Sequence, residues 1–523
     1  MADLTLSPLQ PVPAGAEGRT GSDRASMFDV SERTDVQYLR KHAVGLGGVL
    51  FLTVTGSAPI SAMLFNVPIS VGYGNGIGTP AGFIFAGVVL AIFAVGYTAM
   101  TRKITAAGGF YSFISHGLGQ VLGTGTALAA VVGYSVFEAS LAGGFAYFLH
   151  LKLAVTGGVT VPWEWLALFM VALIAVLAYF DIRLSAKILG VFLVCEVIIL
   201  LIFDGGVLGQ SSHVTAAAVN PVNAFKGFPG GGGLAVGGAG VGIFFAFWSW
   251  VGFEMAPNYG EESKNPKRNV ALALYISVIG LGVFYTLTSW AGIAGYSSIH
   301  AAAHVAQKAS ATFYFLPATH YIGVWAAKTM SYLIITGSFA CGMAFHNTAA
   351  RYFYSLGREH VLPSALGKTH HRWKSPHVAT ITQSVVAAII VGLFAIFVGT
   401  NTAASQAYTQ LYGLMAVMGV IIIVAVQALV SVAIWRYFRT NHPTEHHIWK
   451  TVLAPAISFV AQGVVLYLLF DNLTLIGGGI GYANILGPID AAVFVVGIGT
   501  ALYLKRNKPA RFEAVGRLIN EGV

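Results

Sequence analysis

The chain has 523 residues, of which 56% are hydrophobic and only 9% are charged, and its mean hydropathy is +0.73. Soluble domains carry close to a quarter charged residues, so this composition excludes a soluble globular protein and indicates many membrane-spanning helices. The formal net charge of +9 does not indicate a nucleic-acid partner, because the basic residues are spread over many segments with little aromatic interleaving.

Residues 1–41 are polar and rich in Pro, Gly and Ser, and they are predicted to form a disordered cytoplasmic tail. Apolar segments follow, and each is close to the about 20 residues that a spanning helix needs. These predicted spans cover residues 43–69, 79–100, 121–149, 163–180, 188–209, 235–257, 270–294, 321–349, 377–399, 406–436, 451–471 and 484–504. No apolar leader with a cleavage site precedes the first span, so that span is expected to direct insertion.

Lys and Arg residues predict the orientation of the chain in the membrane. With the N-terminus inside, all of them except Lys152, Lys226, Lys308 and Lys328 fall on the cytoplasmic side. This asymmetry follows the positive-inside rule. We therefore predict a multi-pass protein of the cytoplasmic (inner or plasma) membrane with both termini in the cytoplasm.

Two of the predicted spans are interrupted near their middle by polar and helix-breaking residues. Residues 55–59 read Thr-Gly-Ser-Ala-Pro in the first span, and residues 248–252 read Trp-Ser-Trp-Val-Gly in the sixth. A break at that depth leaves backbone N–H and C=O groups that need polar partners. A single break is equally explained as a packing kink, but two breaks five helices apart indicate a substrate site at the centre of an inverted-repeat transporter.

Other chemistries have little support in the sequence. Cys195 and Cys341 both lie within predicted spans, which disfavours a disulfide framework and a metal site. No nucleotide-binding or hydrolase motif stands in a plausible context. We therefore expect no enzyme activity, no cofactor, no metal and no nucleic-acid partner.

Three loop motifs identify a family. Residues 107–111 read Ala-Gly-Gly-Phe-Tyr after the second span, and residues 247–254 read Phe-Trp-Ser-Trp-Val-Gly-Phe-Glu before a Gly-Glu-Glu-Ser-Lys-Asn-Pro-Lys-Arg run at 260–268. After the eighth span come Phe-His-Asn at 345–347, Arg-Tyr at 351–352, Leu-Gly-Arg at 356–358 and Leu-Pro at 362–363. With twelve spans, this order resembles the amino acid–polyamine–organocation superfamily of secondary transporters over about residues 40–510.

The resemblance implies an all-α membrane protein of twelve transmembrane helices with the leucine-transporter-type fold. Helices 1–5 (residues 42–209) and helices 6–10 (235–436) would be inverted repeats, with broken helices 1 and 6 side by side at the centre. Helices 11–12 (451–504) would complete a transporter domain at 42–510, and 505–523 would form a cytoplasmic C-terminal tail.

Helix 1 departs from the commonest pattern of the family, because its run at residues 56–61 resembles a subgroup with an Ala-Pro break. Pro59 has no N–H, so one donor for a substrate carboxylate is missing, and the Ser57 and Ser61 hydroxyls would have to replace it. Whether the substrate carries a carboxylate is therefore left open.

The predicted substrate-binding residues lie at the two breaks and on helix 3. They are Thr55, Gly56, Ser57, Ala58, Ile60, Ser61, Tyr134, Glu138, Phe247, Trp248, Ser249, Trp250 and Gly252. The resemblance to arginine/agmatine-type relatives implies that Trp248 folds over the bound substrate, the alternative being that both tryptophans pack against neighbouring helices. Glu138 is expected either to pair with a substrate ammonium or to make an interhelical hydrogen bond.

Three further carboxylates have predicted roles in coupling or gating. Glu196 on helix 5 falls, by resemblance, where several proton-coupled or sodium-independent relatives carry a lysine close to helices 1 and 8. Glu196, Thr336 and Ser338 are the predicted proton- or ion-coupling residues, and Glu196 would load and release a proton or contribute to a sodium site. The alternative is a structural carboxylate that accepts hydrogen bonds from helix 8 hydroxyls such as Thr336 or Ser338. Glu261 and Glu262 would form either a salt-bridge network at the cytoplasmic gate or a solvated loop.

The predicted function is a secondary active transporter that imports an amino acid or a related amine by alternating access, with a proton as the coupling ion. A polyamine or organic-cation carrier, or an ion-independent exchanger, is the alternative, and a ligand sensor that does not transport is a more remote one. The expected partners are a small-molecule substrate, a proton (or sodium) and the lipid bilayer.

Overall fold

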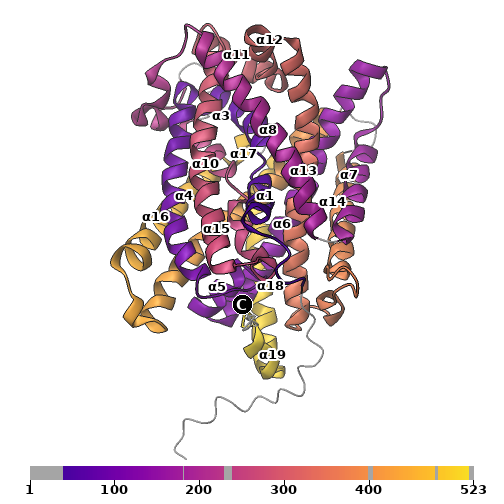
Figure 1. Ribbon diagram of the computed structural model, residues 1–523, viewed down its shortest axis with the longest axis vertical. Helices are drawn as coiled ribbons and strands as arrows, with labels where there is room; N and C mark the ends of the chain where they lie inside the picture. The colour runs from indigo at the N-terminus through magenta and orange to yellow at the C-terminus, as the bar shows by residue number, and fades with distance from the viewer. Residues whose placement is uncertain (1–38, 181, 229–237, 399–403, 477–480, 518–523) are drawn as a thin grey trace, which may run out of the picture. The chain divides into compact units, whose positions relative to one another are not determined.

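The computed structural model describes residues 39–180, 182–228, 238–398, 404–476 and 481–517. In this part of the chain the regular structure is helical, apart from one isolated bridge between Val44 and Ser263. Figure 1 shows the long helices running in the vertical direction, with α11 and α12 at the upper end and α5 and α19 at the lower end.

The first half of the chain contains the first predicted repeat, residues 42–209, and the start of the sixth span. Its helices are α1 (Leu46–Gly56), α2 (Pro59–Ser61), the π-helical turn η3 (Ala62–Asn66), α3 (Val67–Tyr73), α4 (Thr79–Thr101), α5 (Phe110–Leu118), α6 (Gln120–Gly157), α7 (Trp163–Tyr179), α8 (Ile182–Gln210) and α9 (Ala239–Trp248), the last of which opens the sixth span.

The helices that follow complete the chain. They are the 3-10 helix η7 (Phe253–Glu262), α10 (Pro266–Ala294), α11 (Ile299–Lys308), α12 (Phe315–Tyr321), α13 (Val324–Arg358), α14 (His377–Val398), the π-helical turn η10 (Ala407–Tyr412), α15 (Gly413–Thr440), the π-helical turn η12 (Ile448–Leu453), α16 (Ala454–Asp471), α17 (Leu473–Ile476), α18 (Leu486–Asn507) and α19 (Pro509–Ala514).

Ten helices of the described residues are long and apolar enough to cross a membrane. They cover Leu46–Tyr73, Gly76–Thr101, Gln120–Gly157, Leu184–Gln210, Ala239–Glu262, Pro266–Ala294, His377–Phe397, Ala407–Thr440, Ile448–Asp471 and Ala483–Asn507. The prediction of an all-α, multi-pass membrane protein is confirmed. The count of twelve also includes the shorter apolar helix Trp163–Tyr179 and a span within α13, so twelve spans, with the first ten in two inverted repeats, stay a prediction.

The first span breaks where the sequence predicts. Helix α1 ends at Gly56, Ala58 takes a left-handed conformation with φ of 43°, and Pro59 begins α2. A proline has no N–H to donate to the preceding turn, but it fits the first position of a new helix. The π-helical turn η3 then widens the same span up to Asn66, and such turns are frequent at functional sites.

The sixth span breaks at the second predicted position. Helix α9 ends at Trp248, Gly252 has a φ of +119°, and the chain resumes as η7. The Glu254 carboxylate accepts hydrogen bonds from the Gly252 N–H (2.8 Å) and the Tyr134 hydroxyl (3.1 Å). Glu254 therefore fixes the conformation of this break from a buried position.

The two breaks cross at glycines. A Cβ on Gly252 would lie 2.3 Å from the carbonyl carbon of Gly56, so no larger residue fits there without a shift of the backbone. The Ser57 hydroxyl donates to the Trp250 carbonyl (3.2 Å), and the Tyr285 hydroxyl donates to the Ser57 carbonyl (2.8 Å). These bonds satisfy backbone groups that the breaks release, and they hold the broken spans together.

Longer helices pack around the crossing. Helix α6 packs against α13, α15 and α18, while α4 packs against α10, and buried apolar side chains from these helices form one continuous core. At the other end of the chain, α18 continues beyond residue 504 to Asn507, and α19 occupies part of the predicted tail. The predicted N-terminal tail, apart from residues 39–41, lies outside the described residues.

Candidate functional site

A small inner cavity of about 30 Å³ lies where the two breaks meet. Its lining comes from α1, α2, η3, α6, α9, α13, η10 and α15, and from the backbone at both breaks. The lining residues are Gly56, Ser57, Ala58, Ser61, Ala62, Asn66, Phe137, Ser140, Leu141, Trp248, Ser249, Val251, Cys341, Phe345, Tyr412 and Ala416. That volume holds only about one or two water molecules, so an amino acid enters this cavity only after its walls move.

Two polar groups in the inner cavity have no partner within the described protein. The Ser61 hydroxyl and the Asn66 side-chain oxygen are buried without a hydrogen bond. The Asn66 amide itself donates to the Ser249 hydroxyl (2.9 Å), which ties η3 to the second break. Buried polar groups without partners are rare in proteins, and at this place they indicate a ligand.

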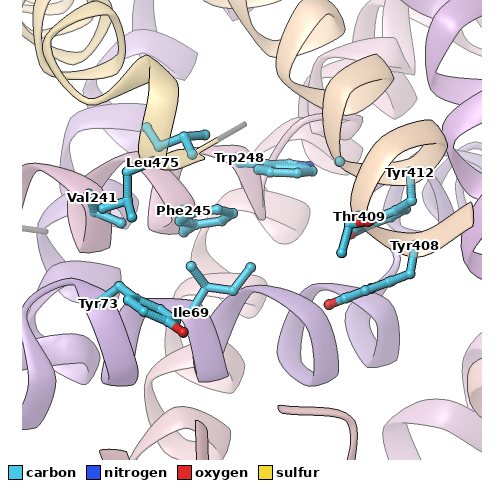
Figure 2. Close-up of a pocket in the computed structure, with 11 residues that line it drawn as sticks. Ile69, Tyr73, Val241, Phe245, Trp248, Tyr408, Thr409, Tyr412 and Leu475 are labelled. Atoms are coloured by element: carbon cyan, nitrogen blue, oxygen red, sulfur yellow. The ribbon is translucent and has the colours of Figure 1, made fainter. Parts of the chain in front are cut away.

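A larger outer cavity of about 240 Å³ lies next to the inner one. Figure 2 shows its walls, formed by residues from α3, α9, η10, α15 and α17. The lining residues are Ile69, Tyr73, Val241, Phe245, Trp248, Tyr408, Thr409, Tyr412, Gly413, Leu475 and Ile476. Among these described residues there is no charged side chain, so polar recognition there rests on hydroxyl and backbone groups and on aromatic faces.

Trp248 and Tyr412 separate the two cavities. Both residues line both cavities, and their rings stack with centroids 5.9 Å apart at 26° (Figure 2). Tyr408 stacks in turn on Tyr412 at 5.4 Å. Trp248 therefore lies between the two cavities, and its role as a lid over the substrate stays a prediction.

Several other predicted substrate residues lie behind the cavity walls. Thr55, Ile60, Tyr134, Phe247, Trp250 and Gly252 are not among the lining residues of either cavity. Trp250 is fully buried, its indole N–H donates to the Val278 carbonyl (3.4 Å), and its ring packs against Tyr285. For Trp250 the structure shows the packing alternative, because this side chain turns to α10 rather than to the cavity.

Glu138 makes interhelical hydrogen bonds instead of lining the inner cavity. Its Oε2 accepts from Gln383 (2.7 Å) and lies 2.9 Å from Nδ1 of His346, and both partners are buried. The preceding residues on the same two helices, Phe137 and Phe345, do line the cavity, and their rings stack at 4.5 Å. Glu138 thus holds α6 to α13 and α14 directly behind the wall.

Glu196 reaches the first break from α8. Its Oε2 accepts from the Ile60 N–H at 3.4 Å, whereas Oε1 has no hydrogen-bond partner among the described residues. The expectation that Thr336 and Ser338 satisfy this carboxylate is wrong, because their hydroxyls donate to the Leu333 and Ile334 carbonyls of their own helix. A glycine, Gly337, faces Glu196 instead, and a Cβ there would lie 2.8 Å from Oε1.

Some residues that line the inner cavity are not predicted from the sequence. Asn66 carried a usable signal, because a polar side chain inside an apolar span needs a partner. Tyr412 carried none, because an aromatic residue near the start of a span is also common at a membrane interface. Ser140, Cys341 and Ala416 become cavity residues only through the packing of α6, α13 and α15.

Buried ion pairs close one side of the molecule, the side on which the segment before α1 (residues 39–45) lies. Arg351 pairs with Glu262 (2.7 Å) and Arg358 pairs with Glu261 (2.6 Å), and no side chain of the four is more than 5% exposed. The backbone of Val44 adds hydrogen bonds to Glu262 and Lys264. Of the two predicted alternatives for Glu261 and Glu262, the structure shows the salt-bridge network.

Two broken helices that cross at a closed polar cavity, sealed by ion pairs on one side and by aromatic rings on the other, define a membrane transport protein. The family model described as amino acid permease matches residues 46–498, so the chain belongs to this family. It is a secondary transporter of the amino acid–polyamine–organocation superfamily, whose related members are transporters rather than enzymes.

Curated relatives share moderate similarity with the chain. It is 22% identical to the branched-chain amino acid permease BcaP of Bacillus subtilis over 371 residues, which is 66% of this chain and 72% of the relative. It is 23% identical to the methylthioribose transporter of the same organism over 406 residues, with 74% and 79% covered. The low-affinity putrescine importer PlaP of Escherichia coli is 22% identical over 321 residues, with 60% and 66% covered.

Proposed function

We propose that this protein imports a small α-amino acid or a related amine across the cytoplasmic membrane, with both termini inside and a proton as the coupling ion. The observation that carries the proposal is the inner cavity between the two breaks, where the Ser61 hydroxyl and the Asn66 oxygen lack partners. A polar head group fits these partners, while an apolar part fits against the rings of Trp248 and Tyr412.

The absence of charge in the cavity walls favours a zwitterion. None of the described lining residues is acidic or basic, so both charges of an amino acid would be met by backbone groups at the breaks and by the hydroxyls of Ser57 and Ser61. Free N–H groups at the start of a half-helix suit a carboxylate, and free carbonyls at the end of one suit an ammonium. The apolar outer wall then favours an uncharged side chain.

Alternating access would move the broken spans against the rest of the bundle. In the proposed twelve-helix, inverted-repeat arrangement, α1, α4, α9 and α10 rock relative to α6, α7, α13 and α14. The present conformation, with its buried ion pairs intact on the N-terminal side, corresponds to a state closed toward the cytoplasm. Separation of Trp248 from Tyr412 would admit the substrate from the outside.

Glu196 is the proposed coupling residue. Its carboxylate touches the Ile60 N–H at the break, and it has no ion pair with Lys, Arg or His in the described part of the chain. Proton binding would weaken its bond to Ile60 and free the start of α2 to move against α8. Substrate binding and proton binding would then act on the same few backbone atoms.

Transport into proteoliposomes tests the proposal directly. Wild-type protein should accumulate its substrate under a pH gradient that is acidic outside, and Glu196→Gln should abolish that pH dependence while still being stabilised thermally by the substrate. Thr336→Val is a matched control on the facing helix, because its hydroxyl bonds only within α13. Unchanged pH dependence in Glu196→Gln would remove this residue from the coupling mechanism.

A carrier for amines without a carboxylate is the second candidate. The faces of Trp248, Tyr408 and Tyr412 favour it, because aromatic faces attract ammonium groups. A thermal-shift screen separates the two candidates, since a ligand that binds only the folded state raises its apparent stability. Stabilisation by amino acids but not by the corresponding decarboxylated amines supports the first, and the reverse supports the second.

A further inference from the structure

A second buried carboxylate lies on the same helix as Glu196. Asp204 is 4% exposed, its Oδ2 accepts a hydrogen bond from the Thr288 hydroxyl (2.8 Å), and its Oδ1 has no partner among the described residues. Neither the substrate cavities nor the predicted coupling site includes this residue. Asp204 is expensive to keep in a membrane-spanning helix, and such carboxylates are functional by default.

Asp204 and Glu196 share one face of α8. They are eight residues apart, a spacing that returns to the same side of a helix, about 12 Å further along its axis. Helix α10 contributes a residue near each carboxylate: the Thr288 hydroxyl donates to Asp204, and Tyr285, whose hydroxyl donates to the Ser57 carbonyl, lies close enough to Glu196 for the two groups to interact electrostatically. Tyr285 and Thr288 are three residues apart, so a ladder of hydroxyls on α10 stands opposite the pair of carboxylates on α8.

The surroundings of the two carboxylates contain no compensating cation. In the described chain no Lys, Arg or His nitrogen forms an ion pair with either group. The titratable groups that face them are Tyr314 beside Asp204, and Tyr285 and Cys341 beside Glu196. Protonation would neutralise each carboxylate in turn without a partner cation.

Asp204 lies toward the end of the helix that is remote from the closed gate. The start of α8 is at the ion-pair side, where Ile182 and Ser185 share a small pocket with Glu262 and Arg351. Asp204 is six residues before the opposite end at Gln210, where Gln210 and Ser211 bond to the Tyr321 and Ala294 carbonyls. In the proposed orientation, Asp204 therefore stands between the external solution and Glu196.

We propose that Asp204 is the outer proton-binding residue of the transporter and that it delivers its proton to Glu196. The protonated Asp204 carboxylic acid releases H⁺ to the ionised Glu196, through water or through the Thr288 and Tyr285 hydroxyls, and Asp204 is left as a carboxylate. A proton from outside restores the acid, while the Glu196 proton leaves to the inside after the gate opens. The inference rests on the proposed role of Glu196.

The test separates proton delivery from substrate movement. Proteoliposomes are assayed for accumulation driven by an acidic outside and for substrate counterflow at equal pH on both sides, which needs no net proton transfer. Asp204→Asn should lower gradient-driven accumulation by at least about tenfold, equivalent to about 1.4 kcal/mol, and retain counterflow. Thr288→Val should also lower gradient-driven accumulation and change its pH profile, and Asp204→Glu should restore accumulation. Asp471→Asn, at the exposed end of α16, is the control and should match wild type.

The other outcomes would contradict either the role of Asp204 alone or proton coupling through Glu196 as well. Wild-type accumulation in Asp204→Asn, together with loss of pH dependence in Glu196→Gln, overturns the role of Asp204 and leaves the proposed function standing. Wild-type pH dependence in both variants overturns proton coupling through Glu196 as well. Equal loss of counterflow and accumulation in Asp204→Asn, unrescued by Asp204→Glu, makes Asp204 a structural residue and also overturns the proposal.

Discussion

The two tryptophans of the second break have opposite surroundings although they are two residues apart. Trp248 lines both cavities and stacks on Tyr412, whereas Trp250 is fully buried between α4 and α10. The residue type is the same, and only the direction of the side chain differs. This pair therefore places a cavity-lining tryptophan and a core tryptophan within a single short segment.

Trp248→Ala should weaken substrate binding by about tenfold or more, because it removes a stacking surface and opens the inner cavity to the outer one. Trp250→Ala should instead destabilise the fold by about 3–5 kcal/mol, as large-to-small changes in a core do. Binding is measured by thermal shift against substrate concentration, and stability by the unfolding midpoint without ligand. A large loss of stability in Trp248→Ala with normal affinity would contradict its role as a lid.

Gly252→Ala tests the close approach of the two breaks. Alanine at a φ of +119° is strained, at about 1–3 kcal/mol, and its Cβ would meet the Gly56 carbonyl group. We expect loss of transport together with reduced thermal stability. Gly280→Ala is the control, because a Cβ there meets nothing within 4 Å and a helical alanine is favourable.

At the scale of elements, the buried ion-pair cluster, which is the proposed cytoplasmic gate, is made from three separate segments. Arg351 and Arg358 extend from the end of α13, Glu261 and Glu262 from the end of η7, and the backbone of Val44 from the segment before α1. Glu261 also accepts a hydrogen bond from the Ala107 N–H, which adds the loop before α5. In the proposed transport cycle, opening on this side would require all of these contacts to separate together.

Glu262→Gln should weaken the closed state, because it leaves Arg351 buried without its ion-pair partner. Breaking one partner of a buried pair costs about 3–5 kcal/mol. We expect faster alkylation of Cys341, which lines the inner cavity, in a background where the exposed Cys195 is replaced by Ser. Glu445→Gln is the control, because its pair with Lys103 is exposed to solvent. An unchanged rate of alkylation would show that this pair does not hold the gate.

The sequence predicts the position of both breaks, because Gly, Ser and Pro inside an apolar span have direct consequences for backbone hydrogen bonding. It also singles out Trp248, which lines the inner cavity, while the predicted role of this residue over the substrate stays a prediction. It does not predict which way Glu138 points, because His346 and Gln383, which bind it, are far away in the sequence. Asp204 lies within the predicted span 188–209 and carries the same sequence signal as Glu196, a carboxylate inside an apolar segment, but its partner Thr288 is known only from the packing of α10.

At the scale of the whole molecule, the C-terminal segment is tied to the gate side. The Glu359 carboxylate, just beyond α13, bonds with the Gly516 N–H and the Tyr111 hydroxyl, and burial raises the pKa of Glu359 to about 8. A Cβ on Gly516 would lie 2.5 Å from the Ser115 side chain, so the segment packs closely on α5. Residues near both ends of the membrane domain thus contact the same loop-and-gate region.

A raised pKa in the folded state makes this contact dependent on pH. The folded protein binds the Glu359 proton more tightly than the unfolded chain does, so the stabilisation is complete below the ordinary pKa of 4.5 and is lost as the pH rises through about 8. The thermal midpoint of wild-type protein should therefore fall as the pH rises from about 4.5 to about 8, and limited proteolysis of residues 508–517 should increase over the same range.

Glu359→Gln should flatten both of these pH profiles, because glutamine has no proton to lose. Glu513→Gln on α19 is a control carboxylate in an exposed part of the same segment. If the wild-type and Glu359→Gln profiles have the same slope, the proton on Glu359 does not govern the docking of the C-terminal segment.

The difference in size between the two cavities has a consequence for inhibition. A rigid apolar molecule that fills the outer cavity of about 240 Å³ cannot enter the inner cavity of about 30 Å³. Such a molecule would hold the rings of Trp248 and Tyr412 in their stacked position. The substrate would then be kept out of the inner cavity, and the proposed transport cycle would stop before it binds. An effective blocker of this transporter therefore does not need to resemble its substrate.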